Sequence, residues 1–174
     1  MFDVYVKQSA VDKAEEYFSR LASQRLEGMG LLIGVNCEHN GKRFVMVDEF
    51  MTTDTASTSV SVRFSPSAFE KLSQQLKGKL GEQVVVGWCH SHPSYGCFLS
   101  TTDVSTQRRF FNEEFHVASV FDPLRKEVFG AKTAMSKRFY RLHGNGYSEV
   151  SFAVIANRKS FSVNYSGLLD SNSV

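Results

Sequence analysis

The chain has 174 residues, of which 42% are hydrophobic, and its formal net charge is +2. This length suits one domain with a sizeable core, and the interspersed charges exclude the dense basic stripe that nucleic-acid binding requires. No apolar run is long enough to span a membrane, and the first residues lack the pattern of a signal peptide. We therefore expect a soluble, cytoplasmic protein without nucleic-acid or membrane partners.

The first predicted elements are a strand and an amphipathic helix. Residues 4–6 are typical of a short strand. Apolar side chains then recur at helical spacing as far as about Ala22, and Ser9 or Asp12 could cap the start of this helix. We expect the helix to pack its apolar face against a sheet.

A hairpin is predicted after the first helix. Residues 30–35 and 44–50 have the apolar composition of strands. Between them, Asn40 and Gly41 favour the positive φ angles of a tight turn. The two strands should therefore pair in antiparallel fashion.

The next segment is predicted as a loop, a strand and a helix. Residues 51–59 are rich in Thr and Ser, which is typical of a loop, and residues 59–64 alternate as a half-buried strand does. Ser65 would cap a helix that has Pro66 at its first position and runs to about Lys79.

The remaining pattern completes an α/β fold. Residues 83–88 predict the central strand, and residues 103–112 predict a third helix. Three further strands are predicted at residues 116–121, 128–133 and 138–142. The expected fold is a curved, mostly antiparallel sheet flanked by helices.

One short stretch contains the parts of a zinc site, namely His90, His92, Pro93, Ser100 and Asp103. If the apolar run before His90 is a strand, both imidazoles leave it on the same side. Pro93 ends the strand, and Asp103 at the start of the next helix can return a carboxylate to the same point. Two imidazoles and one carboxylate leave a fourth position for water, as in catalytic zinc sites.

Each part of this motif also has an ordinary interpretation. A His-x-His pair is usually just two polar residues. The spacing of Ser100 and Asp103 is typical of a helix N-terminus, with Ser100 as the N-cap. Neither interpretation explains why the pair, the proline and the capped helix occur together, so the combination favours a metal site.

The stretch 90–107 resembles the His-x-His-Pro-x6-Ser-x-x-Asp signature of the JAMM (MPN+) metalloprotease family. Its flanking residues, 95–97 and 103–107, are most similar to two members, the proteasome-lid deubiquitinase and the signalosome deneddylase. A separate upstream glutamate of the family matches Glu27, which precedes the apolar run 29–34. The resemblance covers roughly residues 4–142.

This resemblance implies a cytidine-deaminase-like fold and a zinc ion held by His90, His92 and Asp103. Zinc lowers the pKa of a bound water from about 15.7 to about 7, and Glu27 would act as the base beside it. Ser100 would hydrogen-bond the oxyanion of the tetrahedral intermediate. The residues expected to contact substrate are Tyr95, Cys97, Phe98, Thr53 and Ser61.

The cysteines are consistent with a reducing compartment. Cys37, Cys89 and Cys97 form no CxxC pair and are odd in number. We expect Cys89 to be buried on the face away from the metal, and Cys97 to line the site without binding zinc. A cysteine-protease interpretation would leave Ser100 and Asp103 without a role.

Residues 1–142 are predicted to form one MPN+/JAMM catalytic domain, and residues 143–174 a C-terminal extension that is flexible in part. Within the extension, residues 150–156 could form a strand or a helix, and the polar end is expected to be loose.

By resemblance, the substrate would be ubiquitin or a ubiquitin-like protein cut after a C-terminal Gly-Gly. The proteasome is the candidate partner, and an archaeal homologue is the expected setting. Two alternatives stay open: a non-catalytic scaffold subunit of the same fold, and a zinc hydrolase of a small molecule.

Overall fold

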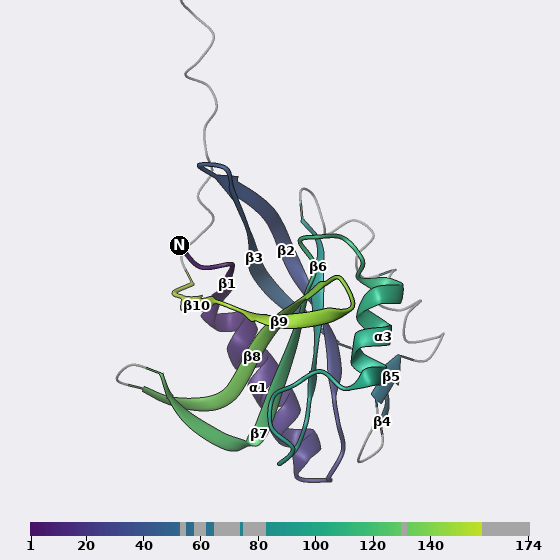
Figure 1. Cartoon of the computed structure of the whole chain (residues 1–174). Coiled ribbons are helices and arrows are strands. Elements are labelled where there is room, and N and C mark those ends of the chain that lie inside the picture. Colours follow the sequence, from purple (N-terminus) through teal and green to yellow (C-terminus); the bar gives the residue numbers. More distant parts are fainter. Residues whose placement is uncertain (53–54, 58–61, 65–73, 75–82, 130–131, 158–174) are drawn as a thin grey trace, which may run out of the picture.

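A computed structural model of the chain describes residues 1–52, 55–57, 62–64, 74, 83–129 and 132–157. These residues include an eight-stranded sheet, a two-stranded sheet and the helices α1 (Gln8–Ala22) and α3 (Thr101–Phe110) (Figure 1). The large sheet contains β1 (Val4–Lys7), β2 (Met29–His39), β3 (Lys42–Met51), β6 (Val84–Ser91), β7 (Val117–Phe129), β8 (Lys132–His143), β9 (Gly146–Val150) and β10 (Phe152–Ile155). The small sheet pairs β4 (Thr55–Ser57) with β5 (Val62–Phe64).

The strand order in the large sheet is β10-β1-β3-β2-β6-β7-β8-β9. The pairs β10–β1, β1–β3 and β6–β7 are parallel, and the other neighbouring pairs are antiparallel. This curved, mostly antiparallel sheet with helices confirms the predicted α/β class. Within the described ranges, no helix is both long and apolar enough to cross a membrane.

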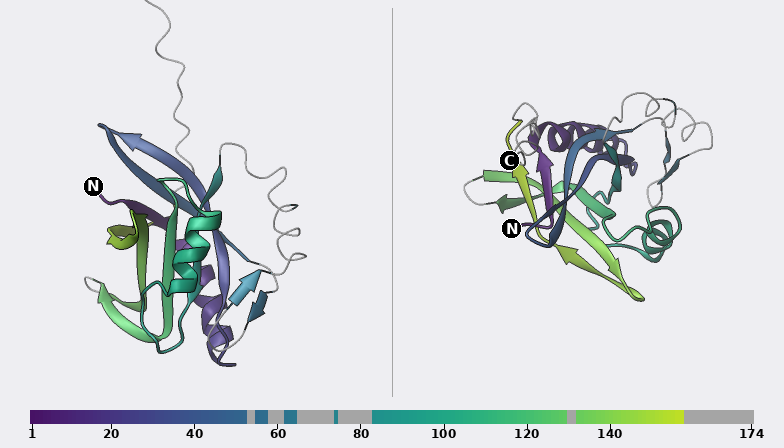
Figure 2. Two further views of the ribbon diagram at one scale, coloured as in Figure 1. Left: turned by 45° about the vertical axis from the view of Figure 1, so that its right-hand side comes forward. Right: turned by 90° about the horizontal axis from the view of Figure 1, so that it is seen from above.

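The two helices pack against opposite faces of the sheet (Figure 2). On one face, Phe18 of α1 is fully buried, and its ring centroid lies 5.7 Å from that of Phe50 and 5.2 Å from that of Phe121. On the other face, the ring of Trp88 stacks on Phe111 at the end of α3, with centroids 5.9 Å apart. Each buried ring of this size contributes roughly 1.5–3 kcal/mol of apolar burial. The sheet is therefore held between two cores.

The predicted cap of the first helix is wrong. The helix begins at Gln8, before both predicted cap residues, and its N-cap residue Lys7 makes no side-chain cap hydrogen bond. The N–H of Ser9 instead donates to Oδ1 of Asn157, at 2.9 Å. Because β10 lies parallel to β1, the residues after β10 reach the start of α1. A distant residue thus does what a local cap was expected to do.

The predicted hairpin is confirmed. Asn40 and Gly41 have φ angles of 50° and 72°, and pairing between β2 and β3 continues up to them. The segment after β3 differs in part from the prediction, because β4 lies within the stretch expected to be a loop. The strand predicted at residues 59–64 is confirmed at Val62–Phe64. The helix predicted from Ser65 to Lys79 lies outside the described residues apart from Gln74.

The strand predicted at residues 128–133 is wrong. Val128 and Thr133 face each other across the antiparallel pair of β7 and β8, so they belong to two different strands. The strands predicted at residues 116–121 and 138–142 lie almost wholly within these two long strands. Gly130, between them in the sequence, was a turn signal that the apolar residues around it obscured.

Part of the predicted C-terminal extension belongs to the main sheet. Strand β9 pairs with β8, and β10 pairs in parallel with β1 at the opposite end of the strand order. Of the two possibilities for residues 150–156, the strand is the one that forms, at Phe152–Ile155. The chain therefore returns to its own first strand to complete the sheet.

Candidate metal centre

Two imidazoles and a carboxylate converge at the end of β6. His90 lies in β6 and His92 just beyond it, and their Nε2 atoms are 2.9 Å apart, which confirms that both rings project to the same side. Asp103, in the first turn of α3, places Oδ2 3.3 Å from Nε2 of His90 and 3.7 Å from Nε2 of His92. The exposed fractions of the three residues are 1%, 6% and 9%. These three buried side chains converge closely enough that they could hold one metal ion.

The donor set fits a zinc ion. In a tetrahedral site with ligand bonds of about 2.0–2.1 Å, the ligand atoms are separated by about 3.3 Å, close to the spacings seen here. Nδ1 of His92 lies 3.2 Å from the carbonyl oxygen of Gly96. Since a carbonyl can only accept, Nδ1 carries the proton and Nε2 keeps its lone pair for a metal. The three residues would supply three ligands and leave a fourth position open.

A capping box places Asp103. Oγ of Ser100 accepts a hydrogen bond from the N–H of Asp103 at 3.2 Å, and Oδ2 of Asp103 accepts one from the N–H of Ser100 at 2.7 Å. The prediction that Ser100 caps this helix is confirmed, although the helix begins at Thr101, two residues earlier than expected. The cap fixes the carboxylate relative to the helix axis.

Glu27 is held beside the cluster by its neighbour Gly28. The N–H of Gly28 donates to Oγ of Ser91 at 2.9 Å, and its carbonyl accepts from the N–H of Ser91 at 3.0 Å. A Cβ at position 28 would lie 2.6 Å from Cδ1 of Leu21, 2.7 Å from Cε1 of Tyr17 and 2.9 Å from Cδ1 of Phe18, so any larger residue would displace side chains of α1. The segment before β2 is thereby fastened to the last residue of β6, between the two histidines.

The protonation states suit metal binding. Burial raises the pKa of Glu27 to about 7, with Asp103 adding to the rise and His90 opposing it. Burial and the neighbouring His90 lower the pKa of His92 to about 4. Burial opposes ionisation of Asp103, but hydrogen bonds from His90 and Ser100 outweigh it and lower that pKa to about 2. Near neutral pH, His92 is therefore neutral and Asp103 ionised, as ligands must be.

A model of the family described as "JAB1/Mov34/MPN/PAD-1 ubiquitin protease" matches residues 2–114, which is more than half of the chain. The chain belongs to this JAB/MPN family. The match includes all three residues of the cluster, Glu27 and Ser100.

Individual relatives of this JAB/MPN chain are named as subunits of large complexes or as a ubiquitin hydrolase. The "26S proteasome regulatory subunit RPN11" of Eremothecium gossypii is 37% identical over 126 residues, covering 70% of this chain and 38% of the relative. The "Ubiquitin carboxyl-terminal hydrolase RPN11" of Saccharomyces cerevisiae is 38% identical, covering 58% and 32%. The "COP9 signalosome complex subunit 5" of Caenorhabditis elegans is 36% identical, covering 69% and 33%. The chain thus spans about a third of the length of these relatives.

A solved structure shares the fold. The solution structure of a protein from Desulfitobacterium hafniense superposes with a TM-score of 0.61, covering 88% of this chain and 93% of that one. Its sequence identity is 16%, so the likeness concerns the fold alone.

Two positioning residues of this JAB/MPN domain were missed from the sequence. Ser91, between the two histidines, was given no role from the sequence, although it ties the Glu27 segment to β6. Gln107 accepts a hydrogen bond from Nε1 of Trp88 at 2.6 Å and donates to the carbonyl of Phe111 at 3.0 Å. It is 2% exposed and anchors α3 to β6. A glutamine one helical turn after Asp103, on the same helix face, was the available signal.

The residues predicted to contact substrate lie in different settings. Tyr95 and Phe98 are 56% and 44% exposed, and the ring of Phe98 lies 4.9 Å from that of His92. Cys97 is half-buried, with Sγ 3.5 Å from Oγ of Ser136 and its carbonyl accepting from the hydroxyl of Tyr140 at 2.7 Å. The structure therefore leaves both aromatic side chains exposed, and it places the ring of Phe98 against a residue of the cluster.

The other two residues predicted to contact substrate, Thr53 and Ser61, lie outside the described residues of the JAB/MPN domain.

The cysteines near the cluster are poor nucleophiles. Cys89 is fully buried in the core on the α1 side, as predicted, and burial raises the pKa of its thiol. Burial also raises the pKa of the Cys97 thiol. Because a reactive cysteine needs a lowered pKa, the cysteine-protease interpretation loses its support.

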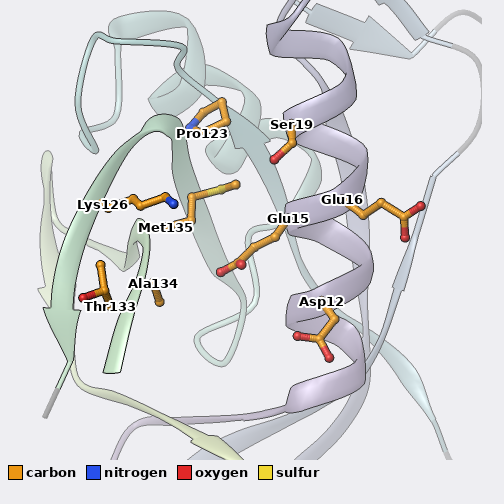
Figure 3. Close-up of a pocket in the computed structure, with 9 residues that line it drawn as sticks. All are labelled: Asp12, Glu15, Glu16, Ser19, Pro123, Lys126, Thr133, Ala134 and Met135. Carbon is orange, nitrogen blue, oxygen red and sulfur yellow. The ribbon is translucent and has the colours of Figure 1, made fainter. Parts of the chain in front are cut away.

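A groove between α1 and the β7–β8 hairpin shares no lining residue with the metal centre (Figure 3). Its walls are Asp12, Glu15, Glu16, Ser19, Pro123, Lys126, Thr133, Ala134 and Met135. The three carboxylates come from one helix, and Glu15 is already paired with Nζ of Lys137 at 2.9 Å. Among the described residues, the cluster that could hold a metal ion lies at the end of β6 and not in this groove.

Proposed function

We propose that the chain is a zinc-dependent isopeptidase or peptidase that cleaves ubiquitin or a ubiquitin-like protein after a C-terminal Gly-Gly. The observation that carries the proposal is the buried, convergent set of His90, His92 and Asp103 with Glu27 beside it. The yeast relative named a ubiquitin carboxyl-terminal hydrolase supports the choice of substrate class.

Zinc held by the two histidines and Asp103 would supply a Lewis acid and activate a water molecule near neutral pH. Glu27 would take a proton from the attacking water on its carboxylate and pass it to the departing amine. A base works best when its pKa lies near the working pH, and burial brings Glu27 to about 7. This residue is the proposed general base and not a ligand.

The contacts of Ser100 allow it both to cap α3 and to act in catalysis. In the cap, its Oγ accepts from the N–H of Asp103, which uses an oxygen lone pair. The hydroxyl proton is not consumed by this contact and is free to be donated. We propose that it hydrogen-bonds the oxyanion of the tetrahedral intermediate, as the sequence resemblance implied.

The substrate tail would pass beside the exposed rings of Tyr95 and Phe98. The ring of Phe98, 4.9 Å from that of His92, would narrow the approach to the cluster, and a tail that ends in Gly-Gly has no side chains to clash with it. Cys97, Thr53 and Ser61 remain proposed substrate contacts. An extended tail can also gain affinity through backbone hydrogen bonds to a strand edge.

The names of the relatives support a proteasome-type or signalosome-type assembly as the partner. The chain spans about a third of the length of those relatives. The partner assembly is therefore proposed from their names and from the shared family alone.

The test uses the purified protein with ubiquitin, or a ubiquitin-like protein, extended by a short peptide after Gly-Gly. We expect release of the peptide, loss of release with a zinc chelator, and recovery on adding zinc. Asp103→Asn should be inactive under all three conditions. No release from any such substrate by zinc-loaded protein would overturn the proposal and leave the scaffold and small-molecule alternatives.

A further inference from the structure

Asp122 in β7 is a fully buried carboxylate with four donors. Its Oδ1 accepts from the N–H groups of Ser94 at 2.9 Å and Leu124 at 3.1 Å. Its Oδ2 accepts from the N–H of Gly96 at 2.9 Å and pairs with Nε of Arg125 at 3.3 Å. A buried carboxylate is costly unless its lone pairs are occupied in this way. The carboxylate therefore joins β7 to the loop that follows His92.

That loop has an unusual backbone. Ser94 and Gly96 both have left-handed conformations, with φ angles of 69° and 84°. A residue other than glycine persists there only when its surroundings hold it. Asp122 accepts hydrogen bonds from the N–H groups of these same two residues. The loop conformation thus depends on a carboxylate almost thirty residues away in the sequence.

The backbone of Gly96 connects Asp122 to a proposed metal ligand. The N–H of Gly96 donates to Asp122, and its carbonyl oxygen lies 3.2 Å from Nδ1 of His92. This carbonyl requires the proton to sit on Nδ1 and so leaves the lone pair on Nε2. Nδ1 of His90, by contrast, is buried with no hydrogen-bond partner among the described groups, and the His90 ring stacks on Trp88 instead.

We propose that Asp122 is a positioning residue for zinc binding, acting through the loop 94–96 to fix the tautomer and the orientation of His92. The inference rests on the proposed metal centre, since it assigns the means by which one ligand is held ready. Asp122 is not one of the three proposed ligands, and it acts through its hydrogen bonds to the loop. Partners of this indirect kind typically alter metal affinity by about 10–100-fold when they are changed.

Asp122→Asn is an informative variant because it keeps the shape of the side chain and removes one hydrogen-bond acceptor. Each carboxylate oxygen accepts from one loop N–H, Oδ1 from Ser94 and Oδ2 from Gly96. Whichever way the amide turns, its NH2 group faces one of these donors, so one loop N–H loses its acceptor. The loop should relax, and the carbonyl of Gly96 should no longer be held against His92.

The experiment measures two properties of wild type and Asp122→Asn. The first is the zinc dissociation constant, determined by competition with a chelator. The second is the His92 tautomer in metal-free protein, read from the imidazole 15N chemical shifts. We expect a zinc dissociation constant that is about 10–100-fold higher, and His92 that changes from one Nδ1–H tautomer to a mixture.

Asp48→Asn is the matched control. Asp48 is also a mostly buried, ion-paired carboxylate, 2.6 Å from Nζ of Lys7 and 2.9 Å from Nε2 of Gln83, on strand β3. Its replacement should leave both readouts at wild-type values. Equal loss of zinc affinity in the two variants would point to general destabilisation and overturn the specific role of Asp122.

The outcomes separate the inference from the proposed function. Wild-type protein that binds no zinc would overturn the metal centre. Asp122→Asn with wild-type zinc affinity and an unchanged His92 tautomer would overturn the role of Asp122 alone. If Asp122→Asn does not fold, amide hydrogen exchange of the wild-type protein tests the role of Asp122 instead. The N–H groups of Ser94 and Gly96 should then be protected from exchange. Free exchange of both would show that Asp122 does not hold the loop.

Discussion

Ser100 and Asp103 exchange two hydrogen bonds across the first turn of α3, so the proposed oxyanion donor and a proposed zinc ligand are placed by one capping box. The cap satisfies N–H groups that a helix start otherwise leaves open. It also directs Oδ2 of Asp103 toward both imidazoles. A local device of helix stability thus sets the geometry of the site.

Ser100→Ala should lower the free energy of unfolding by about 1 kcal/mol, because it removes the N-cap oxygen. Turnover of the Gly-Gly substrate should fall by about 10²–10³-fold, the usual effect of losing one oxyanion donor. Thermal unfolding and kinetics check the two effects, with Ser100→Thr, which keeps the hydroxyl, as the control. Turnover of Ser100→Ala within a few-fold of wild type would remove this residue from the mechanism.

Asp103→Asn should lose zinc and activity while the fold remains. The amide oxygen can still accept from the N–H of Ser100, so the cap and the stability change little. The neutral amide is, however, a weaker ligand than the carboxylate. Metal analysis and unfolding curves check this, and Asp12→Asn on α1 serves as an exposed control. Wild-type zinc content together with wild-type activity would refute the ligand assignment.

Glu27→Gln should keep zinc and the substrate complex but lose about 10²–10⁴-fold in rate, because it removes the proton acceptor and retains the shape. The measurements are zinc content, substrate affinity and single-turnover rate. Glu16→Gln, an exposed glutamate of α1, should match wild type in all three. A Glu27→Gln rate close to that of wild type would show that another group is the base.

Ser91→Ala and Ser119→Ala form a matched pair of buried substitutions. Each removes one hydrogen bond to backbone, from Gly28 N–H to Ser91 Oγ in one case and from Ser119 Oγ to the carbonyl of Arg138 in the other. Both should destabilise the protein by roughly 1–3 kcal/mol. Only Ser91→Ala should also reduce the rate, because it frees the segment that carries Glu27. If Ser91→Ala and Ser119→Ala have equal catalytic rates per folded molecule, Ser91 does not position the segment that carries Glu27.

Replacement of either glycine of the substrate tail by alanine should greatly reduce turnover. The added methyl group would meet the narrow approach beside Tyr95 and Phe98. Kinetics on matched Gly-Gly, Gly-Ala and Ala-Gly substrates measure the effect, with Phe98→Ala tested for recovery of the alanine substrates. Equal turnover of all three substrates by the wild-type protein would contradict a narrow approach.

Much of the metal cluster follows from local sequence. His90 and His92 project together because side chains alternate along a strand, and Ser100 and Asp103 meet because they lie one helical turn apart. Asn40 and Gly41 likewise specify their turn through backbone preferences of their own. These relationships span a few residues, so their spacing alone predicts them.

Other features were decided only by the tertiary structure. Asn157 takes the place of a local cap on α1 because β10 lies beside β1. Glu27 reaches the cluster because β2 pairs with β6 and Gly28 bonds Ser91. Asp122 reaches the loop after His92 because β7 lies parallel to β6.

The sequence by itself therefore determined the candidate ligand set, the capped helix and the hairpin turn, since each depends on short-range spacing and backbone preference. The tertiary structure decided which distant groups surround that set. Those contacts depend on strand order and on close approaches such as that of Gly28 to Leu21. The burial that raises the pKa of Glu27 to about 7 arises only when the sheet and both helices are assembled around it.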